Sequence, residues 1–144
     1  MLFELYYANV HSIVPNMRSY EEERSDWLLA VSPALEKEPR KILLCMDGQD
    51  IAGYVQYYIR DRLIMIEEVQ LARRYHKTTV FFGMCRFLAR NLPDGLLDLE
   101  AYAHRQNTYS QMLMKKLGMK ILSEDSGEFV HLRGDARVIR TRFS

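Results

Sequence analysis

Two adjacent glutamates, Glu67 and Glu68, have the clearest capacity for chemistry in this chain. They interrupt an apolar stretch, with Leu63–Ile66 before them and Val69–Leu71 after them. Carboxylates in the middle of a strand are unfavourable for β structure and costly to bury. A carboxyl group partly removed from water has a raised pKa and can act as a general base. Because strand residues alternate in direction, we expect one glutamate to face a cleft and the other the opposite side, unless a bulge intervenes.

The alternative interpretation of this pair is a solvent-facing or salt-bridged carboxylate, with Arg60 or Arg62 as the partner. Alternation along the strand does not choose between Glu67 and Glu68 as the base.

A second candidate site follows the same strand, where basic residues precede two threonines. The basic residues are Arg73, Arg74, His76 and Lys77. Thr78 and Thr79 favour the start of a helix, predicted over about residues 78–91, because threonine hydroxyls cap helix N-termini. Free amides at a helix N-terminus, together with nearby cations, bind phosphate groups. The alternative is that the basic residues form a solvated patch on a loop.

The stretch from Asn107 to Met119 predicts a short amphipathic helix that runs into a strand. Its apolar residues recur at helical spacing, at Tyr109, Met112, Leu113 and Leu117. Lys115 and Lys116 stand in the last turn, where positive charge suits the helix dipole. Gly118 can adopt the left-handed conformation that closes a helix.

The same stretch resembles the last core helix of the GNAT superfamily of acyl-CoA N-acyltransferases, which often reads N-x-x-A-x-x-L-Y-x-K-L-G-F. Met119 stands where phenylalanine is usual, and Met114 replaces the usual tyrosine. In many relatives that tyrosine is the general acid, a role that Met114 cannot fill. The positions that fit are Asn107, Ser110, Leu113, Lys116, Leu117 and Gly118.

The resemblance is weaker over residues 71–81, where the family usually reads V-x-P-x-Y-R-x-x-G-x-G. Tyr75 fits, His76 replaces arginine or glutamine, and Thr79 and Phe81 replace glycine or alanine. Glycine lets a backbone come close to a pyrophosphate. Threonine hydroxyls and the basic residues would have to replace that fit by hydrogen bonds and charge.

The resemblance implies acetyl-CoA as cosubstrate without a metal, and an acidic base on strand 63–71, Glu67 or Glu68. As replacements for the missing acid, Tyr102 and the tyrosines at 54, 57 and 58 are candidates. Tyr109 lies about 140° around the helix from position 114 and cannot replace a side chain there. The implied cofactor contacts are Val69, Gln70, Leu71, His76, Lys77, Thr78, Thr79, Val80, Phe81 and Asn107.

Composition indicates an ordinary globular protein with a single domain over residues 1–144. The formal net charge of +1 gives no global attraction to nucleic acids or anionic membranes. The sequence shows no membrane-spanning run and no signal-peptide pattern, so we expect a cytoplasmic protein. Cys45 and Cys85 lie in apolar segments and are expected to be buried free thiols rather than a disulfide. The four histidines show no metal-ligand spacing.

The expected fold class is mixed α/β, an antiparallel meander followed by helix, strand, helix and a closing strand pair. This order matches the GNAT core over about residues 41–133, in which the strand after the cofactor helix splays from its neighbour. Before the meander we expect a strand at 3–7, a helix at 19–30 capped by Ser19 and Glu22, and irregular chain around Pro33 and Pro39. The expected later elements are strands 41–46, 51–60, 63–71 and 96–101, then strands 119–122 and 128–133 around a turn at 125–127.

These features favour an N-acetyltransferase that moves an acetyl group from acetyl-CoA to an unidentified primary amine, in a small molecule or a peptide, by direct attack. The alternative is a catalytically impaired GNAT-fold protein that binds acyl-CoA or a protein partner, which Met114 and the missing glycines favour. Chains of this fold often pair, so a homodimer is compatible with the sequence. Nucleic-acid binding through the tail arginines is disfavoured by Asp135 and the charge balance. The tail that carries Arg133, Arg137, Arg140 and Arg142 equally suits an edge strand or a docked segment.

Overall fold

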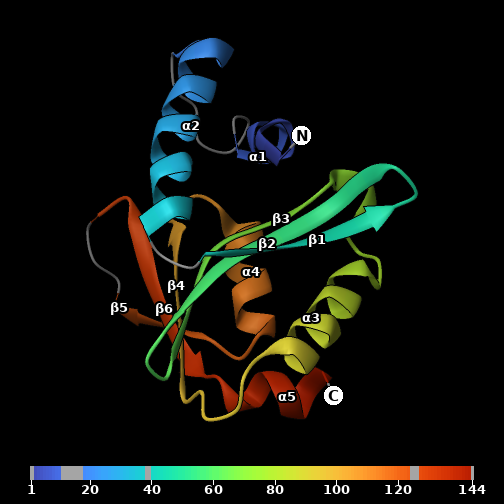
Figure 1. The fold of residues 1–144 in the computed structure, drawn as a ribbon, viewed down its shortest axis with the longest axis vertical. Coiled ribbons are helices and arrows are strands. Elements are labelled where there is room, and N and C mark those ends of the chain that lie inside the picture. Colours follow the sequence, from blue (N-terminus) through green and yellow to red (C-terminus); the bar gives the residue numbers. More distant parts are fainter. Residues whose placement is uncertain (1, 11–17, 38–39, 124–126, 144) are drawn as a thin grey trace.

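A six-stranded mixed sheet forms the centre of the computed structural model, which describes residues 2–10, 18–37, 40–123 and 127–143 (Figure 1). The strand order is β1-β2-β3-β4-β6-β5, with only β3 and β4 parallel among the paired neighbours of the described chain. This is the predicted fold class. The strands are β1 (Lys41–Asp47), β2 (Asp50–Arg60), β3 (Leu63–Leu71), β4 (Asp98–His104), β5 (Lys120–Ser123) and β6 (Phe129–Asp135).

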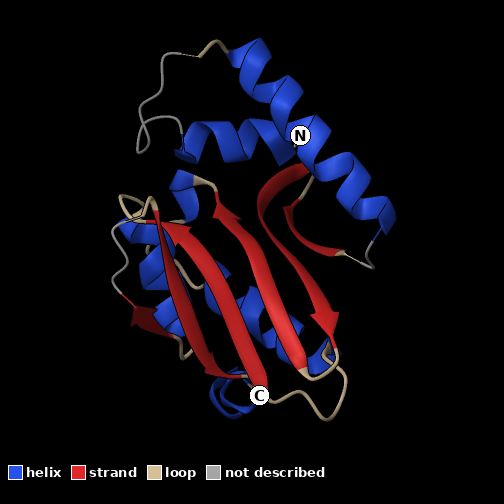
Figure 2. Ribbon diagram, turned by 90° about the vertical axis from the view of Figure 1, so that its left-hand side faces the viewer, coloured by secondary structure: helices blue, strands red, loops and turns tan. Residues whose placement is uncertain are grey.

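Helices lie on both faces of the sheet. Figure 2 shows α1 (Leu2–Val10) and α2 (Tyr20–Lys37) across one end of the near face, with the remaining helices behind the strands. Behind the sheet, α3 (Val80–Asn91) and α4 (Thr108–Lys116) bury the main core, which includes Ile66, Leu88 and Leu113. The face under α1 and α2 is the more polar one, and it carries the residues that the site uses.

The N-terminal region differs from the sequence prediction. Residues 3–7, expected as a strand, belong to helix α1. Their aromatic side chains pack against α2: Phe3 contacts the rings of Tyr20 and Trp27. Helix α2 continues through position 33, where irregular chain was predicted. Pro39 lies outside the described residues, as does most of the predicted turn at 125–127.

The capping box at the start of α2 is confirmed. The Glu22 amide donates to Oγ of Ser19, and the Ser19 amide donates to the Glu22 carboxylate, both at 3.3 Å. Gly118, with φ of 95°, ends α4 in the predicted left-handed conformation.

The C-terminal segment is a docked helix, α5 (Arg137–Phe143), so the edge-strand alternative was wrong. Ile139 and Phe143 are buried in the core, and the Arg140 guanidinium donates to the Leu92 and Pro93 carbonyls. The tail arginines make intramolecular contacts: Arg133 with Asp98, Arg137 with Asp135, Arg140 with Asp94 and Arg142 with the Lys116 carbonyl. These contacts weigh further against a nucleic-acid surface here.

Cys45, half-buried, and Cys85, buried, are free thiols, as predicted. Within the described chain, no group of three metal-ligating side chains comes together, and no helix is long and apolar enough to cross a bilayer.

Candidate active site

Strands β3 and β4 part halfway along their length. They pair in parallel from Leu63 with Asp98 to Ile66 with Ala101, and no further pair between them occurs in the described chain. Helix α4 contacts both strands. The predicted splay is therefore confirmed, and it leaves the edge of β3 beyond Ile66 open to an extended ligand.

A β-bulge places both glutamates where the strands part. Gln56 pairs with Glu68 and Tyr57 pairs with Ile66, so Glu67 is an extra residue in β3. The bulge cancels the alternation, and both carboxylates lie on the face that carries Gln56, toward α1 and α2. The expectation that the two glutamates face opposite sides was wrong for this reason.

Glu68 has the environment of a general base. Its carboxylate accepts a 2.5 Å hydrogen bond from the Tyr54 hydroxyl, and Tyr54 is fully buried. Burial raises the pKa of Glu68 to about 7, the negative charge of Glu67 adds to the rise, and Tyr54 opposes it. The Trp27 indole also opposes the rise, although its N–H makes no well-aligned hydrogen bond with a described residue.

Glu67 is held by donors from two other elements. Its Oε2 accepts from Nε of Arg40 at 2.7 Å and from Nε2 of Gln56 at 3.0 Å. Both members of the ion pair are mostly buried, with side-chain exposures of 16% for Arg40 and 22% for Glu67. Glu67 is thus a fixed neighbour of Glu68, paired with Arg40 instead of the predicted Arg60 or Arg62.

On the other side of the sheet, the loop after β3 leads into the N-terminus of α3. The Thr78 hydroxyl donates to the Tyr75 carbonyl at 2.5 Å and accepts from the Val80 amide at 3.3 Å, so it caps the helix. Thr79, the residue before α3, makes no side-chain cap and is exposed. Its hydroxyl therefore remains on the surface beside the first amides of α3.

Two features of this loop were not predicted. Lys77 adopts a left-handed backbone with φ of 62°, where the sequence offers no glycine. The His76 ring stacks on Tyr109 of α4, with ring centroids 3.9 Å apart, so the loop and α4 touch across the parted strands. His76 Nε2 also lies 2.9 Å from the Leu71 carbonyl.

The remaining expected cofactor residues fall on different sides of β3. Val69 and Leu71 pack in the core beneath α3, while the buried Gln70 side chain accepts from Asn9 of α1 at 2.9 Å. Val80 is partly buried at the start of α3. Asn107 caps α4 by accepting from the Ser110 amide at 3.0 Å. The Leu71 carbonyl accepts from the Asn9 side chain at 2.9 Å and faces away from β2.

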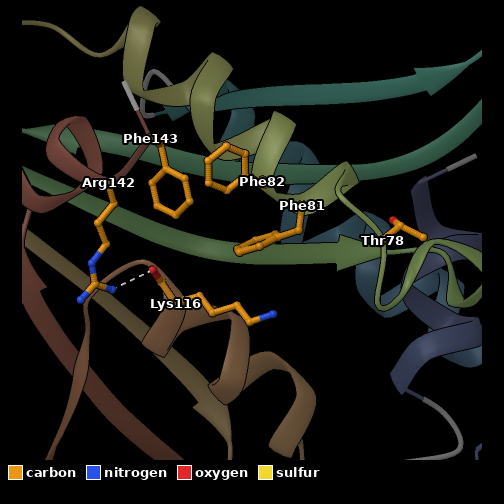
Figure 3. Close-up of a pocket in the computed structure, with 6 residues that line it drawn as sticks. All are labelled: Thr78, Phe81, Phe82, Lys116, Arg142 and Phe143. Carbon is orange, nitrogen blue, oxygen red and sulfur yellow. Dashed lines mark hydrogen bonds between the residues drawn. The ribbon is translucent and has the colours of Figure 1, made fainter.

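A pocket of about 490 Å³ lies beside the N-terminal half of α3 (Figure 3). Its apolar wall comes from phenylalanines of α3 and α5, and its charged groups from α4 and α5. The Arg142 guanidinium donates to the Lys116 carbonyl at 3.0 Å, which leaves the Lys116 side chain extended along the pocket. The lining residues are Thr78, Phe81, Phe82, Lys116, Arg142 and Phe143.

The candidate general acids occupy distinct positions. Met114 is a core residue with 1% exposure, and Tyr57 is also in the core. Tyr58 lies beneath the Arg40 and Arg60 guanidiniums. Tyr102, half exposed, stacks on His131 just beyond the last β3–β4 pair. Tyr54 is the one among these tyrosines that hydrogen-bonds a glutamate of the site, although burial and Glu68 raise its pKa.

The fold is similar to that of several solved structures, although their sequence identities to this chain are low. The PaiA N-acetyltransferase of Thermoplasma acidophilum, solved with coenzyme A, aligns with a TM-score of 0.65 and 16% identity, over 93% of this chain and 90% of that one. A protein of Desulfovibrio desulfuricans described as an acetyltransferase of the GNAT family gives 0.63 and 12%, over 93% and 92%. The spermidine N-acetyltransferase of Vibrio cholerae, solved with coenzyme A and spermine, gives 0.62 and 11%, over 95% and 90%.

The chain has the GNAT fold. No protein-family model and no curated protein matches its sequence. The GNAT fold accounts for the parted strands β3 and β4, and for α3 beginning beside the gap.

Sequence reasoning missed Arg40, Gln56, Trp27 and Tyr6, which surround the carboxylates. Arg40 and Gln56 lie 27 and 11 residues from Glu67 along the chain. The only signal for Gln56 was a polar residue in the otherwise apolar run Val55–Ile59, where a buried amide implies a polar partner.

Proposed function

We propose that this protein is an acetyl-CoA-dependent N-acetyltransferase of primary amines, acting in the cytoplasm. The observation that carries the proposal is the position of Glu68. Its carboxyl group has a pKa raised to about 7 and lies at the point where β3 and β4 of a GNAT fold part.

The side of the sheet behind β3 fits the cosubstrate. Thr79 and the first amides of α3 are donors for a diphosphate, and the basic residues of the preceding loop supply charge. The neighbouring pocket offers aromatic faces for a purine and the Lys116 ammonium for a further phosphate. The open edge of β3 supplies main-chain groups for the amide-containing arm. Acetyl-CoA bound in this way would supply the acetyl group.

The chain's own residues then handle the proton. A primary amine reaches the site as an ammonium ion and gives one proton to the Glu68 carboxylate. The neutral amine forms a bond to the acetyl carbon, and the carbon–sulfur bond breaks. The nitrogen loses its second proton as the amide forms, the leaving sulfur takes up a proton and ends as a thiol, and Glu68 releases the remaining proton to water. Glu67, held by Arg40 and Gln56, supplies the fixed negative charge that keeps Glu68 basic enough for this transfer.

Two measurements test the proposal. Calorimetric titration with acetyl-CoA should show binding, and thiol release with a panel of primary amines should exceed hydrolysis without amine. Glu68→Gln should lower the amine-dependent part about 100-fold or more while cofactor binding persists. Binding without any amine-dependent release would favour the second candidate, a non-catalytic acyl-CoA-binding protein, which the apolar Met114 supports.

A further inference from the structure

We propose, on the basis of the acetyltransferase function proposed above, that Gln56 determines acceptor specificity and selects positively charged alkylamines without a neighbouring carboxylate.

The first observation is an unsatisfied amide oxygen. Gln56 is 5% exposed, and its Nε2 donates to the Glu67 carboxylate at 3.0 Å. This bond fixes the amide orientation, because Oε1 in the same place would oppose a carboxylate oxygen. Oε1 is buried and has no hydrogen-bond partner among the described residues. Buried acceptors of this kind are rare in native proteins, so the oxygen is suited to a donor on a ligand.

The second observation is the pair of carboxylates next to this amide. Gln56 donates to Glu67 and is the β2 neighbour of Glu68, and the two carboxylates accept from Arg40 and Tyr54 respectively. An ammonium group has three N–H donors and a positive charge. It can therefore donate to Gln56 Oε1 and at the same time interact favourably with the carboxylates. A carboxylate or phosphate beside the amine would instead meet like charges and further acceptors.

The third observation is the aromatic wall contributed by the two N-terminal helices. Tyr6 of α1 and Trp27 of α2 are close enough to Glu68 to interact with it electrostatically. Aromatic faces stabilise cations and accept alkyl chains. The aromatic wall therefore adds to the preference for a positively charged amine that the two carboxylates create.

The test uses amine pairs that differ only in an α-carboxylate: tyramine with tyrosine, and cadaverine with lysine. For the parent protein we expect kcat/KM to favour the member without the carboxylate by about 10-fold or more, the worth of one charge-assisted contact. Calorimetry with tyramine or cadaverine, in the presence of coenzyme A, should give the same order of affinity without depending on turnover.

The variant is Gln56→Met, which keeps the side-chain volume and removes the amide. The Kd for the amine should rise by about 10-fold, while the Kd for coenzyme A stays unchanged. Gln49→Met, on the exposed β1–β2 turn, is the matched control and should change neither constant.

The outcomes separate the two proposals. A parent protein that acetylates amines but prefers the carboxylated partner, or a Gln56→Met variant with unchanged amine affinity, overturns the specificity inference alone. A parent protein that acetylates none of these amines and binds no coenzyme A overturns the acetyltransferase function, and with it the inference.

Discussion

The Tyr54 hydroxyl lies 2.5 Å from Oε2 of Glu68, on the sheet face that α1 and α2 cover. Both groups are weak acids in the same buried place, and burial raises the pKa of each. Tyr54 therefore keeps its proton and donates it to the hydrogen bond, while Glu68 remains the group that gains and loses a proton near neutral pH.

The first prediction concerns the pH dependence of turnover. Only ionised Glu68 can accept the amine's proton, and its pKa is raised to about 7, so kcat should fall as pH decreases below 7. Glu68→Gln should lower kcat about 100-fold or more and remove this limb. Stopped assays of amide product from pH 5.5 to 9 would show the acidic limb in the parent protein and its loss in the variant. A parent profile flat down to pH 5.5 would argue against Glu68 as the base.

Glu67→Gln provides a separate test, because the bulge places both carboxylates together. Removing the charge of Glu67 should lower the pKa of Glu68, so the acidic limb should move to lower pH. A silent Glu67→Gln, with an unmoved limb, would mean that the two groups do not interact.

The contribution of Glu68 to stability should fall as pH rises, whereas its contribution to activity should increase. Its pKa is raised from 4.5 to about 7 in the folded state, so the folded protein binds more protons than the unfolded chain between these values. The group's contribution to stability is therefore present below pH 4.5 and is lost as pH rises through 7. Glu68→Gln should increase the free energy of unfolding at pH 8 by on the order of 2 kcal/mol, and much less at pH 4.5. Urea titrations at both pH values would measure the difference, and an equal effect at both would contradict the assignment.

Cofactor affinity should depend on the basic loop. Lys77→Ala should raise the Kd for acetyl-CoA about 10-fold at low salt, and added salt should weaken binding to the parent. Lys120→Ala, an exposed lysine on β5, removes the same charge elsewhere and serves as the control. Equal effects of the two variants would show that the loop contributes only general charge.

Lys77→Gly separates the effect of backbone strain on stability from the effect of the lysine charge on cofactor affinity. The left-handed conformation at φ of 62° costs a lysine roughly 1–2 kcal/mol, which glycine avoids. Lys77→Gly should therefore unfold at a higher temperature than Lys77→Ala while binding acetyl-CoA equally weakly. Calorimetric melting of the two variants decides the point, and equal melting temperatures would show that the loop relaxes.

Met114→Tyr tests the absent acid. Met114 is 1% exposed among core side chains, so a larger tyrosine should lower the free energy of unfolding by roughly 1–3 kcal/mol. At temperatures well below unfolding, the new hydroxyl should raise turnover if departure of the thiol limits the rate. Thiol release by the variant and by the parent protein would be measured side by side. A folded variant with unchanged or lower turnover would contradict the idea that departure of the thiol limits the rate.

Much of the scaffold could be predicted from the sequence, because its signals are local. The bounds of β3 were predicted to the residue, since the run Leu63–Leu71 begins after the turn at 61–62 and ends before the basic loop. The helix ending at Gly118 follows from spacing and one glycine. The N-terminal helix was missed because the aromatic residues in 3–7 favour strands in isolation, and only packing against Tyr20 and Trp27 decides otherwise.

The site itself was less predictable. Glu67 and Glu68 stand out in the sequence, but their common orientation depends on a β-bulge. No glycine in this strand indicates that bulge. Arg40 and Gln56 become relevant only once β2 and the residue that precedes β1 are folded against β3. Long-range contacts of this kind leave almost no trace in composition or periodicity.

The extra residue at position 67 also bears on how strands of this fold should be compared. Deleting Glu67 would restore regular alternation in β3 and would leave Val69 and Leu71 in the core and Glu68 and Gln70 on the polar face. Regular alternation with Glu67 retained would instead exchange these two rows of residues. An alignment of this strand with an unbulged relative therefore needs a one-residue gap, and without it every residue on one side of the gap is assigned to the wrong face of the sheet.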